Sequence, residues 1–380
     1  MAEVQGYCDS KFNPVREILQ QRIASGDELG ASLCINVDGK TVLDLWGGHM
    51  NVAQTKEWTE DTITGVWSST KLVTCLAVQI LASRGLIDVD EKVAAYWPEF
   101  AANGKENAKV SHILSHTSGV PAWDGLISAE EIQDTKKATD RLADQAPWWV
   151  PGEQHGYHLI SWGHMMGELV RRISGKSLTQ FISDEIATPL GADFRLGLPE
   201  QDYSRTADIV PPPPVSLDGI DAASLVVRAM VGSAMDPTLP NQTGFRKSEI
   251  GAANGFSNAR ALARIGSVIS LDGVVDGKKY LSSGTLDKMM EEQAKGLDPA
   301  LLLYTRYGLG VGLPSLQTLP CIPEDDHICF WGGWGGSLLI MDRGRRMTIA
   351  YVMNKMSARP LGNESVDLYA KEIYKILGAL

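Results

Sequence analysis

The feature that most constrains the fold of this chain is a cluster of hydroxyl residues directly before a long apolar run. Residues 67–71 (Trp-Ser-Ser-Thr-Lys) are followed by residues 72–82, in which apolar side chains recur at helical spacing. Hydroxyl side chains are favoured at helix N-termini, so the sequence predicts a helix that begins at Ser68. The run is too apolar for a surface helix, and the rest of the chain is therefore expected to pack around it.

Ser68 and Lys71 stand one turn apart on this expected helix, so their side chains share a face. Burial near the positive end of the helix would lower the pKa of the Lys71 amine and let it accept the serine proton. Ser68 heads the only Ser-x-x-Lys in the sequence. The pattern indicates a nucleophilic serine, and a capped helix with an exposed lysine is the alternative interpretation.

Two further segments carry candidate chemistry. Tyr157 follows Pro151-Gly152 in a loop, and a phenol held beside a lysine ammonium can act as a phenolate base; a buried structural tyrosine is the alternative. Residues 330–337 (Phe-Trp-Gly-Gly-Trp-Gly-Gly-Ser) predict an edge strand whose free N–H groups, with that of Ser68, form an oxyanion hole. A glycine-rich turn between two strands would give the same composition.

The order of the expected elements indicates an α+β fold. Strands are expected at both ends of the chain, with a hairpin around Asp38-Gly39, and helical periodicity dominates the middle. We therefore expect one antiparallel sheet built from the two termini and flanked by helices, with an inserted, mainly helical domain. The expected strands are 30–37, 41–48, 62–67, 307–313, 327–330, 337–341 and 347–353; the expected helices are 14–25, 72–82, 89–100, 110–116, 163–175, 177–187, 257–271 and 366–377.

The domain boundaries follow from this order. Residues 1–66 and 251–380 are expected to form the sheet domain, and residues 67–250 the mainly helical domain. Residues 205–250 show little periodicity and contain four consecutive prolines, so we expect an irregular segment that forms a pocket wall.

Charge and composition exclude several classes of partner. The net charge of −11 with no basic block argues against a nucleic-acid partner, and no apolar stretch is long enough to insert into a membrane. The polar N-terminus and five scattered cysteines favour a cytoplasmic protein. His155, His158 and His164 do not follow a metal-site pattern, so no metal or other cofactor is expected and capping or surface roles are favoured for them.

Taken together, the short motifs carry a family resemblance. The chain resembles the β-lactamase-type serine hydrolases, and more narrowly the family VIII carboxylesterases, which share the class C β-lactamase fold. The resemblance extends in order from about residue 30 to residue 353. The motifs are Ser68-x-x-Lys71, 114–119 (Leu-Ser-His-Thr-Ser-Gly), Pro151-Gly152 before Tyr157, 189–191 (Pro-Leu-Gly) and 331–333 (Trp-Gly-Gly).

The resemblance implies a role for each matching residue. Ser68 would be the nucleophile, Lys71 would deprotonate it or hold the proton network, and Tyr157 would be the general base and acid. The N–H groups of Ser68 and Trp334 would form the oxyanion hole. His116 would be the structural histidine of its His-Thr-Ser-Gly turn.

Two positions depart from the β-lactamase pattern. Such enzymes usually have an asparagine two residues after the tyrosine, where this chain has Leu159, and a lysine where it has Trp331. The loss of both disfavours efficient β-lactam hydrolysis, and an indole favours an apolar substrate group. The residues expected to bind substrate are Tyr157, Trp331, Gly332, Gly333, Trp334, Trp123 and Met230, with Trp148 and Trp149 as further candidates.

The sequence thus predicts a serine carboxylesterase that hydrolyses an apolar small-molecule ester through an acyl-enzyme on Ser68. An acyltransferase of the lovastatin-synthase type would use the same three residues, and no residue decides whether water or an alcohol accepts the acyl group. A weak β-lactamase or a catalytically idle ligand-binding relative is a third hypothesis. The absence of Gly-x-Ser-x-Gly argues against an α/β-hydrolase triad.

Overall fold

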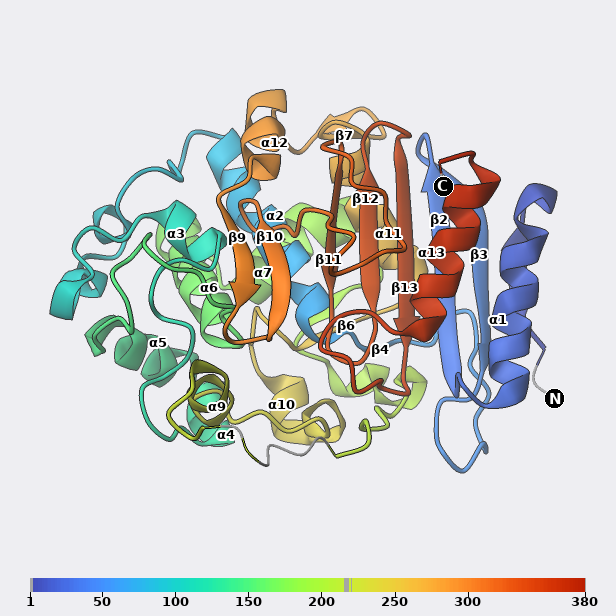
Figure 1. The fold of residues 1–380 in the computed structure, drawn as a ribbon, viewed down its shortest axis with the longest axis horizontal. Helices are drawn as coiled ribbons and strands as arrows, with labels where there is room; N and C mark the ends of the chain where they lie inside the picture. The colour runs from blue at the N-terminus through green and yellow to red at the C-terminus, as the bar shows by residue number, and fades with distance from the viewer. Residues whose placement is uncertain (1–2, 215–218, 220, 380) are drawn as a thin grey trace.

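The computed structural model describes residues 3–214, 219 and 221–379, and its centre is a six-stranded antiparallel sheet (Figure 1). The strand order is β1-β3-β2-β13-β12-β11, so strands from opposite ends of the chain meet where β13 pairs with β2. The expected α+β fold, with a sheet from both termini, is confirmed. The strands are β1 Gln5–Cys8, β2 Gly30–Val37, β3 Lys40–Gly48, β11 Ile328–Gly332, β12 Leu338–Asp342 and β13 Met347–Met353.

Helices cover both faces of this sheet. In Figure 1, α13 (Glu364–Ile376) lies in front of the strands and beside α1 (Asn13–Ser25), whereas α11 (Ala259–Ser270) lies behind them. Strands β2 and β13 are therefore buried on both sides, which explains their near-continuous apolar sequences. Asp38 and Gly39 have φ angles of 50° and 78°, as expected for a tight turn between β2 and β3.

The other half of the molecule is mainly helical (Figure 1). Its central helix is α2, Thr70–Ser83, which is buried from Thr70 to Leu81 and packs against α6 and α7. The apolar run after Lys71 thus forms a core helix, as its composition predicts. The other helices of this half are α3 Val110–Leu114, α4 Ala129–Gln133, α5 Thr135–Asp144, α6 Ser161–Ser174, α7 Leu178–Ile182 and α8 Thr188–Leu190.

Several of the expected elements differ in the structure; the strand expected at 62–67, for example, covers only Thr64–Gly65. Residues 89–100 form no α-helix; 3₁₀ turns occur at Val93–Ala95 and Pro98–Gly104, because the proline forces Trp97 out of the helical region (φ −136°, ψ 80°). The strand expected at 307–313 is instead β10, Leu303–Tyr307, which pairs with β9, Ala294–Asp298. Three glycines at 308, 310 and 312 follow β10, and Gly310 has a φ of 83°.

The segment 205–250 is less irregular than expected. It contains two short helices, α9 (Leu225–Val231) and α10 (Thr243–Lys247), which the sequence pattern did not indicate because each spans only one or two turns. Residues 215–218 and 220 of this segment lie outside the described residues. Three short strands, β4 Thr64–Gly65, β5 Arg195–Leu196 and β6 Gly255–Ser257, form a small separate sheet.

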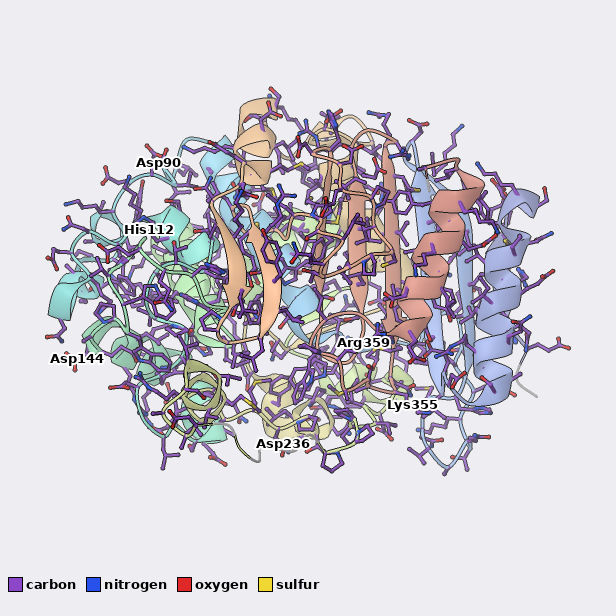
Figure 2. All side chains as sticks on the ribbon, in the orientation of Figure 1. Asp90, His112, Asp144, Asp236, Lys355 and Arg359 are labelled. Atoms are coloured by element: carbon purple, nitrogen blue, oxygen red, sulfur yellow. The ribbon has the colours of Figure 1, made fainter. Side chains whose placement is uncertain are left out.

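The surface of both halves is polar. Charged side chains project along the outline of the molecule, among them Asp90, Asp144 and Lys355 (Figure 2). Across the part of the chain that the structure describes, no helix has both the length and the apolar character that crossing a bilayer requires.

One buried carboxyl group makes the stability of this fold sensitive to pH. Glu28 is almost fully buried and accepts a short hydrogen bond from the Tyr351 hydroxyl, and burial raises its pKa to about 7. The folded protein therefore retains this proton between the usual glutamate pKa of 4.5 and about 7, and stability is lost as the pH rises through that window. A shift of this size corresponds to about 3 kcal/mol.

We expect Glu28→Gln to abolish this pH dependence and to stabilise the protein at about pH 8, with little effect at about pH 5. Denaturant unfolding of both proteins at the two pH values measures the difference. Equal pH dependence in the wild type and the variant would contradict the assignment.

Candidate active site

Ser68 lies in a strained turn at the start of α2. A 3₁₀ turn, Trp67–Ser69, connects β4 to the helix, and Trp67 has a φ of 47°, an uncommon conformation for a bulky residue. The helix expected at Ser68 thus begins at Thr70, and no hydroxyl of the turn caps it. The Ser69 hydroxyl instead bonds that of Ser337 at 3.0 Å, because the turn packs against the sheet. Backbone strain of this kind is characteristic of functional sites.

The Lys71 amine faces the Ser68 hydroxyl, as the spacing of the two residues predicts. Its Nζ lies 3.1 Å from Ser68 Oγ, 2.7 Å from the Leu159 carbonyl oxygen and 3.2 Å from the Ala252 carbonyl oxygen. The side chain is fully buried, and burial holds the pKa of this lysine well below its usual value of 10.5. Burial therefore shifts the equilibrium of this group toward the neutral amine.

The three contacts fix the orientation of the amine. A carbonyl oxygen can only accept, so Leu159 and Ala252 each take one N–H of Lys71. The third position faces Ser68 Oγ: the ammonium form donates a hydrogen bond to this oxygen, and the neutral form would present its lone pair to the serine hydroxyl. This is the arrangement of a general base beside a nucleophile.

Tyr157 completes the cluster around Ser68. The centroid of its ring lies 4.7 Å from Lys71 Nζ, and Tyr157 and Ser68 line the same cavity. Burial raises the pKa of Tyr157, against a smaller opposite effect of the Ser68 side chain. Burial disfavours the charged form of both groups, the Tyr157 phenolate and the Lys71 ammonium, because neither charge is solvated.

The loop that carries Tyr157 is held by neutral histidines. His158 accepts a hydrogen bond from the Ser118 hydroxyl (2.7 Å), its Nδ1 donates to the Gly156 carbonyl (2.6 Å), and burial lowers its pKa to about 3. The His158 backbone N–H donates to His116 Nδ1 at 3.0 Å. His116 thus has the structural role that the resemblance implies.

The other candidate histidines are structural as well. His164 bonds the Ile132 carbonyl at 2.9 Å, and both His158 and His164 are buried, so the expectation of capping or surface roles was wrong for them. No group of three metal-ligating side chains occurs within residues 3–214, 219 and 221–379.

The glycine-rich segment lies at the edge of the main sheet, against the Ser68 turn. Strand β11 is the edge strand, and a Cβ on Gly333 would lie 2.2 Å from the Val66 carbonyl oxygen. The Ser337 hydroxyl donates to the same oxygen at 3.1 Å. Among the hydrogen bonds of the described residues, none uses the backbone N–H of Ser68 or Trp334. Both N–H groups are therefore available to a substrate oxyanion.

A cavity of about 660 Å³ opens onto Ser68. Most of its lining is apolar, and α9 and prolines 211–214 contribute to it, so the expected role of the 205–250 segment as a pocket wall is supported. Of the residues expected to bind substrate, those that line the cavity are Tyr157, Met230, Trp331, Gly332 and Trp334.

The structure does not bring the other predicted pocket residues to this cavity. Trp123 is fully buried in the core, where its indole N–H donates to the Ala138 carbonyl at 2.9 Å, so its assignment to the pocket was incorrect. Trp148 packs under the Arg228 guanidinium, and the Trp149 indole donates to the Thr117 carbonyl. Gly333 packs beneath the site and lets the strand approach the turn.

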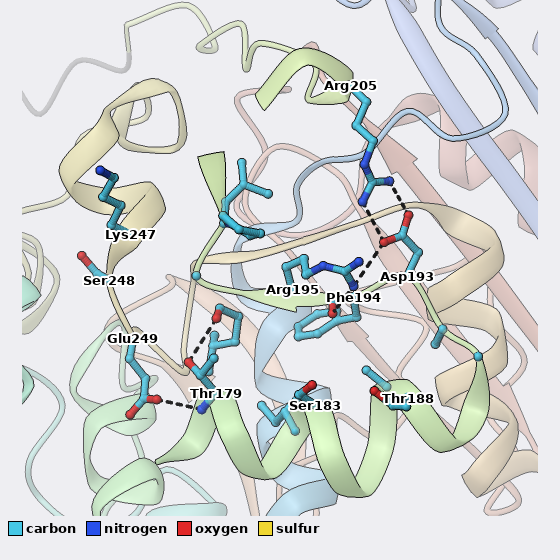
Figure 3. Close-up of a pocket in the computed structure, with 18 residues that line it drawn as sticks. Thr179, Ser183, Thr188, Asp193, Phe194, Arg195, Arg205, Lys247, Ser248 and Glu249 are labelled. Carbon is cyan, nitrogen blue, oxygen red and sulfur yellow. Dashed lines mark hydrogen bonds and ion pairs between the residues drawn. The ribbon is translucent and has the colours of Figure 1, made fainter. Parts of the chain in front are cut away.

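A larger cleft of about 920 Å³ lies between α7, β5 and α10 (Figure 3). Its charged side chains pair within the protein: Arg205 contacts Asp193, and Glu249 accepts the Thr179 backbone N–H at 2.7 Å. None of Ser68, Lys71 and Tyr157 lines it. The Ser68 cavity is therefore the candidate active site.

One important residue has no recognisable signal in the sequence. Asp298, at the end of β9, is buried, and its carboxylate accepts the Tyr157 backbone N–H at 2.9 Å. Ala252 is a second residue without a sequence signal, since its contact with Lys71 uses the backbone carbonyl and not the side chain. A lone aspartate 141 residues from its partner and a backbone carbonyl give no local pattern that would identify either residue.

Known proteins share this architecture. A family model described as Beta-lactamase matches residues 15–371. Esterase/beta-lactamase LipL of Mycobacterium tuberculosis is 30% identical over 366 residues, which cover 93% of this chain and 83% of that protein. A solved family VIII carboxylesterase has 30% identity and a TM-score of 0.89 over 98% of this chain and 100% of its own. A penicillin-binding protein homologue from Caulobacter crescentus has 29% identity and a TM-score of 0.90, with coverages of 98% and 99%.

The close approach of Gly333 to Val66 generates a test. In Gly333→Ala the new Cβ would overlap the Val66 carbonyl, so the end of β11 must move away from Ser68. We expect catalytic turnover to fall by roughly 100-fold, the usual effect of losing one oxyanion donor, and stability to fall by about 1–3 kcal/mol. Ester hydrolysis and thermal unfolding measure the two effects.

Gly344→Ala is the matched control, because its Cβ would have no neighbour closer than 3.5 Å. It should retain both activity and stability. A Gly333→Ala protein with full turnover would show that the position of this strand does not matter for the site.

Proposed function

The chain belongs to the β-lactamase family, and from this membership and its Ser68 site we propose that it is a serine carboxylesterase acting through an acyl-enzyme on Ser68. It is a serine hydrolase of the esterase/β-lactamase fold, and the family resemblance inferred from the motifs is confirmed. The identity of the nucleophile and the kind of ester are the proposed part.

The observation that carries the proposal is the buried Lys71 amine, which lies 3.1 Å from Ser68 Oγ and whose pKa burial holds well below its usual value. Ser68 Oγ attacks the ester carbonyl carbon while its proton passes to Lys71, and the N–H groups of Ser68 and Trp334 stabilise the oxyanion. The tetrahedral intermediate expels the alcohol, which receives the proton from Lys71 through the Tyr157 hydroxyl. The carboxyl group remains esterified to Ser68.

Deacylation repeats the same steps with water. Water gives a proton to the neutral Lys71 and Tyr157 pair as it attacks the acyl carbonyl, and Ser68 leaves with that proton. Because Tyr157 favours its protonated form, it acts in this scheme as a relay between Lys71 and the reacting oxygens.

The cavity favours an uncharged, apolar substrate. Among the described residues that line it, Arg306 alone is formally charged, and its guanidinium is already bound to Glu292 (2.6 Å) and to the Pro314 carbonyl (2.8 Å). Trp331 occupies the position at which the motif resemblance would place the lysine of β-lactamases, and its indole stacks on His116 with an interplanar angle of 12°. A β-lactam carboxylate would find no free cation among the described lining residues, which disfavours the β-lactamase alternative.

The acyltransferase alternative shares every step up to the acyl-enzyme. The same apolar lining that suits an ester would hold an apolar alcohol beside Ser68, where it would compete with water for the acyl group. Hydrolysis is the first choice because the 30%-identical relative is described as an esterase/beta-lactamase and the 30%-identical structure as a carboxylesterase.

A series of p-nitrophenyl esters from acetate to decanoate tests the proposal. We expect rapid release of p-nitrophenol, fastest for an intermediate chain length that fills the cavity, and a loss of roughly 1,000-fold or more in Ser68→Ala. The rate of penicillin hydrolysis should be about 10- to 100-fold lower than the rate of p-nitrophenyl ester hydrolysis, because this is the usual cost of a missing charge-assisted hydrogen bond.

Ser69→Ala is the control for the loss of a neighbouring buried hydroxyl, and its rate should stay within about tenfold of the wild type. Full activity in Ser68→Ala would refute the assignment of the nucleophile. A stable acyl adduct by intact mass, released only when an alcohol is added, would replace the esterase with an acyltransferase.

A further inference from the structure

A buried carboxylate lies behind the active-site tyrosine. Asp298 Oδ2 accepts the Tyr157 backbone N–H and the Tyr307 hydroxyl, both at 2.9 Å. Its Oδ1 accepts the backbone N–H groups of Ala300 (2.8 Å) and Leu301 (3.1 Å). Among the described residues no lysine, arginine or histidine forms an ion pair with this fully buried group, so four neutral donors compensate its charge.

The two oxygens of this carboxylate serve different parts of the chain. Oδ1 closes the turn that follows β9, which is a local arrangement that asparagine or aspartate commonly makes. Oδ2 reaches a loop 141 residues away in sequence. The turn by itself does not require Oδ2, nor the negative charge that makes burial of this group expensive.

The Tyr157 end of this contact belongs to a stretch in which each residue has a separate partner. The Tyr157 N–H is held by Asp298, the His158 N–H by His116, and the Leu159 carbonyl by Lys71. The bond to Asp298 therefore anchors the first residue of the stretch, the one whose ring lies against the amine.

We infer that Asp298 is a positioning residue for the reaction at Ser68, holding the Tyr157 backbone so that the phenol stays within reach of both Ser68 and Lys71. The inference rests on the proposed function, and it concerns a residue that does not itself contact the reacting atoms. Tyr307 supports this role, because its hydroxyl also donates a hydrogen bond to Asp298 Oδ2 and so fixes the orientation of the carboxylate.

The same carboxylate joins the catalytic loop to the substrate cavity. The hairpin β9–β10 supplies Asp298 at the end of its first strand and Thr305, Arg306 and Tyr307 from its second, and these last three residues line the cavity. Leu301 and Leu302, in the turn between the strands, also line it. A displacement of the hairpin would thus reach the Tyr157 backbone through this hydrogen bond.

The charge of Asp298 also supports the role of Tyr157 as a proton relay. It raises the pKa of Tyr157, in addition to the larger effect of burial. Asp298 therefore keeps the phenol protonated, as a relay requires.

Asp298→Asn tests the inference. The amide can keep one oxygen toward the Ala300 and Leu301 N–H groups, but its NH₂ then faces the Tyr157 N–H, donor against donor. With p-nitrophenyl butyrate we expect kcat to fall by about 10- to 100-fold while KM changes by less than about threefold, because substrate contacts stay and only the alignment of the phenol is lost. Both values are measured well below the melting temperature of each protein.

Tyr307→Phe is a milder variant for the case that Asp298→Asn does not fold. It removes one donor to Asp298 Oδ2 and leaves the hydrogen bond from the Tyr157 N–H in place. We expect kcat to fall about three- to tenfold with an unchanged KM. Leu297→Ala is the control in the same hairpin, since Leu297 is 68% exposed and does not line the cavity; its kcat and KM should match the wild type.

The results distinguish a failure of the role inferred for Asp298 from a failure of the proposed function. An unchanged kcat in Asp298→Asn, or in Tyr307→Phe if the first variant does not fold, would overturn the inference, as would a loss confined to KM. If Ser68→Ala retained activity, the proposed function itself would fail, whatever the result for Asp298.

Discussion

The chemistry of this protein depends on the way two backbone carbonyls hold a buried amine. Lys71 lies in the core, and no carboxylate of the described residues forms an ion pair with it, which is unfavourable for an ammonium group and explains why burial lowers its pKa. The carbonyls of Leu159 and Ala252 each accept one N–H of this amine and leave its third position facing Ser68 Oγ. Without either carbonyl the amine would be free to rotate away from the serine.

The fold can be understood as the means of bringing these carbonyls together. Leu159 is 88 residues and Ala252 181 residues from Lys71 in sequence. The start of α2 is tied to the second segment by the Thr70 hydroxyl, which accepts the Gly255 N–H, and by Thr74, whose hydroxyl donates to the Gly251 carbonyl. The first segment is tied to the hairpin β9–β10 through Asp298. Strand β11 approaches the same turn from the sheet, and only glycine at 333 permits the contact with Val66.

Local patterns made part of this site predictable from the sequence. The spacing of Ser68 and Lys71 and the apolar run behind them identify a pair on one helix face, and Asp38-Gly39 identifies a hairpin, because these signals involve few adjacent residues. The contact of the Leu159 carbonyl with Lys71 could not be predicted, because the sequence shows only that a leucine replaces the asparagine usual in β-lactamases and says nothing of the backbone. Asp298 and Ala252 act through backbone contacts over long separations, which composition and periodicity do not encode. Trp123 was misassigned because a tryptophan in the core and one in a pocket look alike in sequence.

The reaction of the protein with a p-nitrophenyl alkylphosphonate tests the central claim most directly, because the serine oxygen bonds to phosphorus as p-nitrophenol leaves and no deacylation follows. The account predicts one p-nitrophenol per chain, a phosphonylated peptide that contains Ser68, and a rate that falls with decreasing pH as Lys71 becomes protonated, with a midpoint well below 10.5. Modification at another residue, or a midpoint near the value of a free lysine, would contradict it.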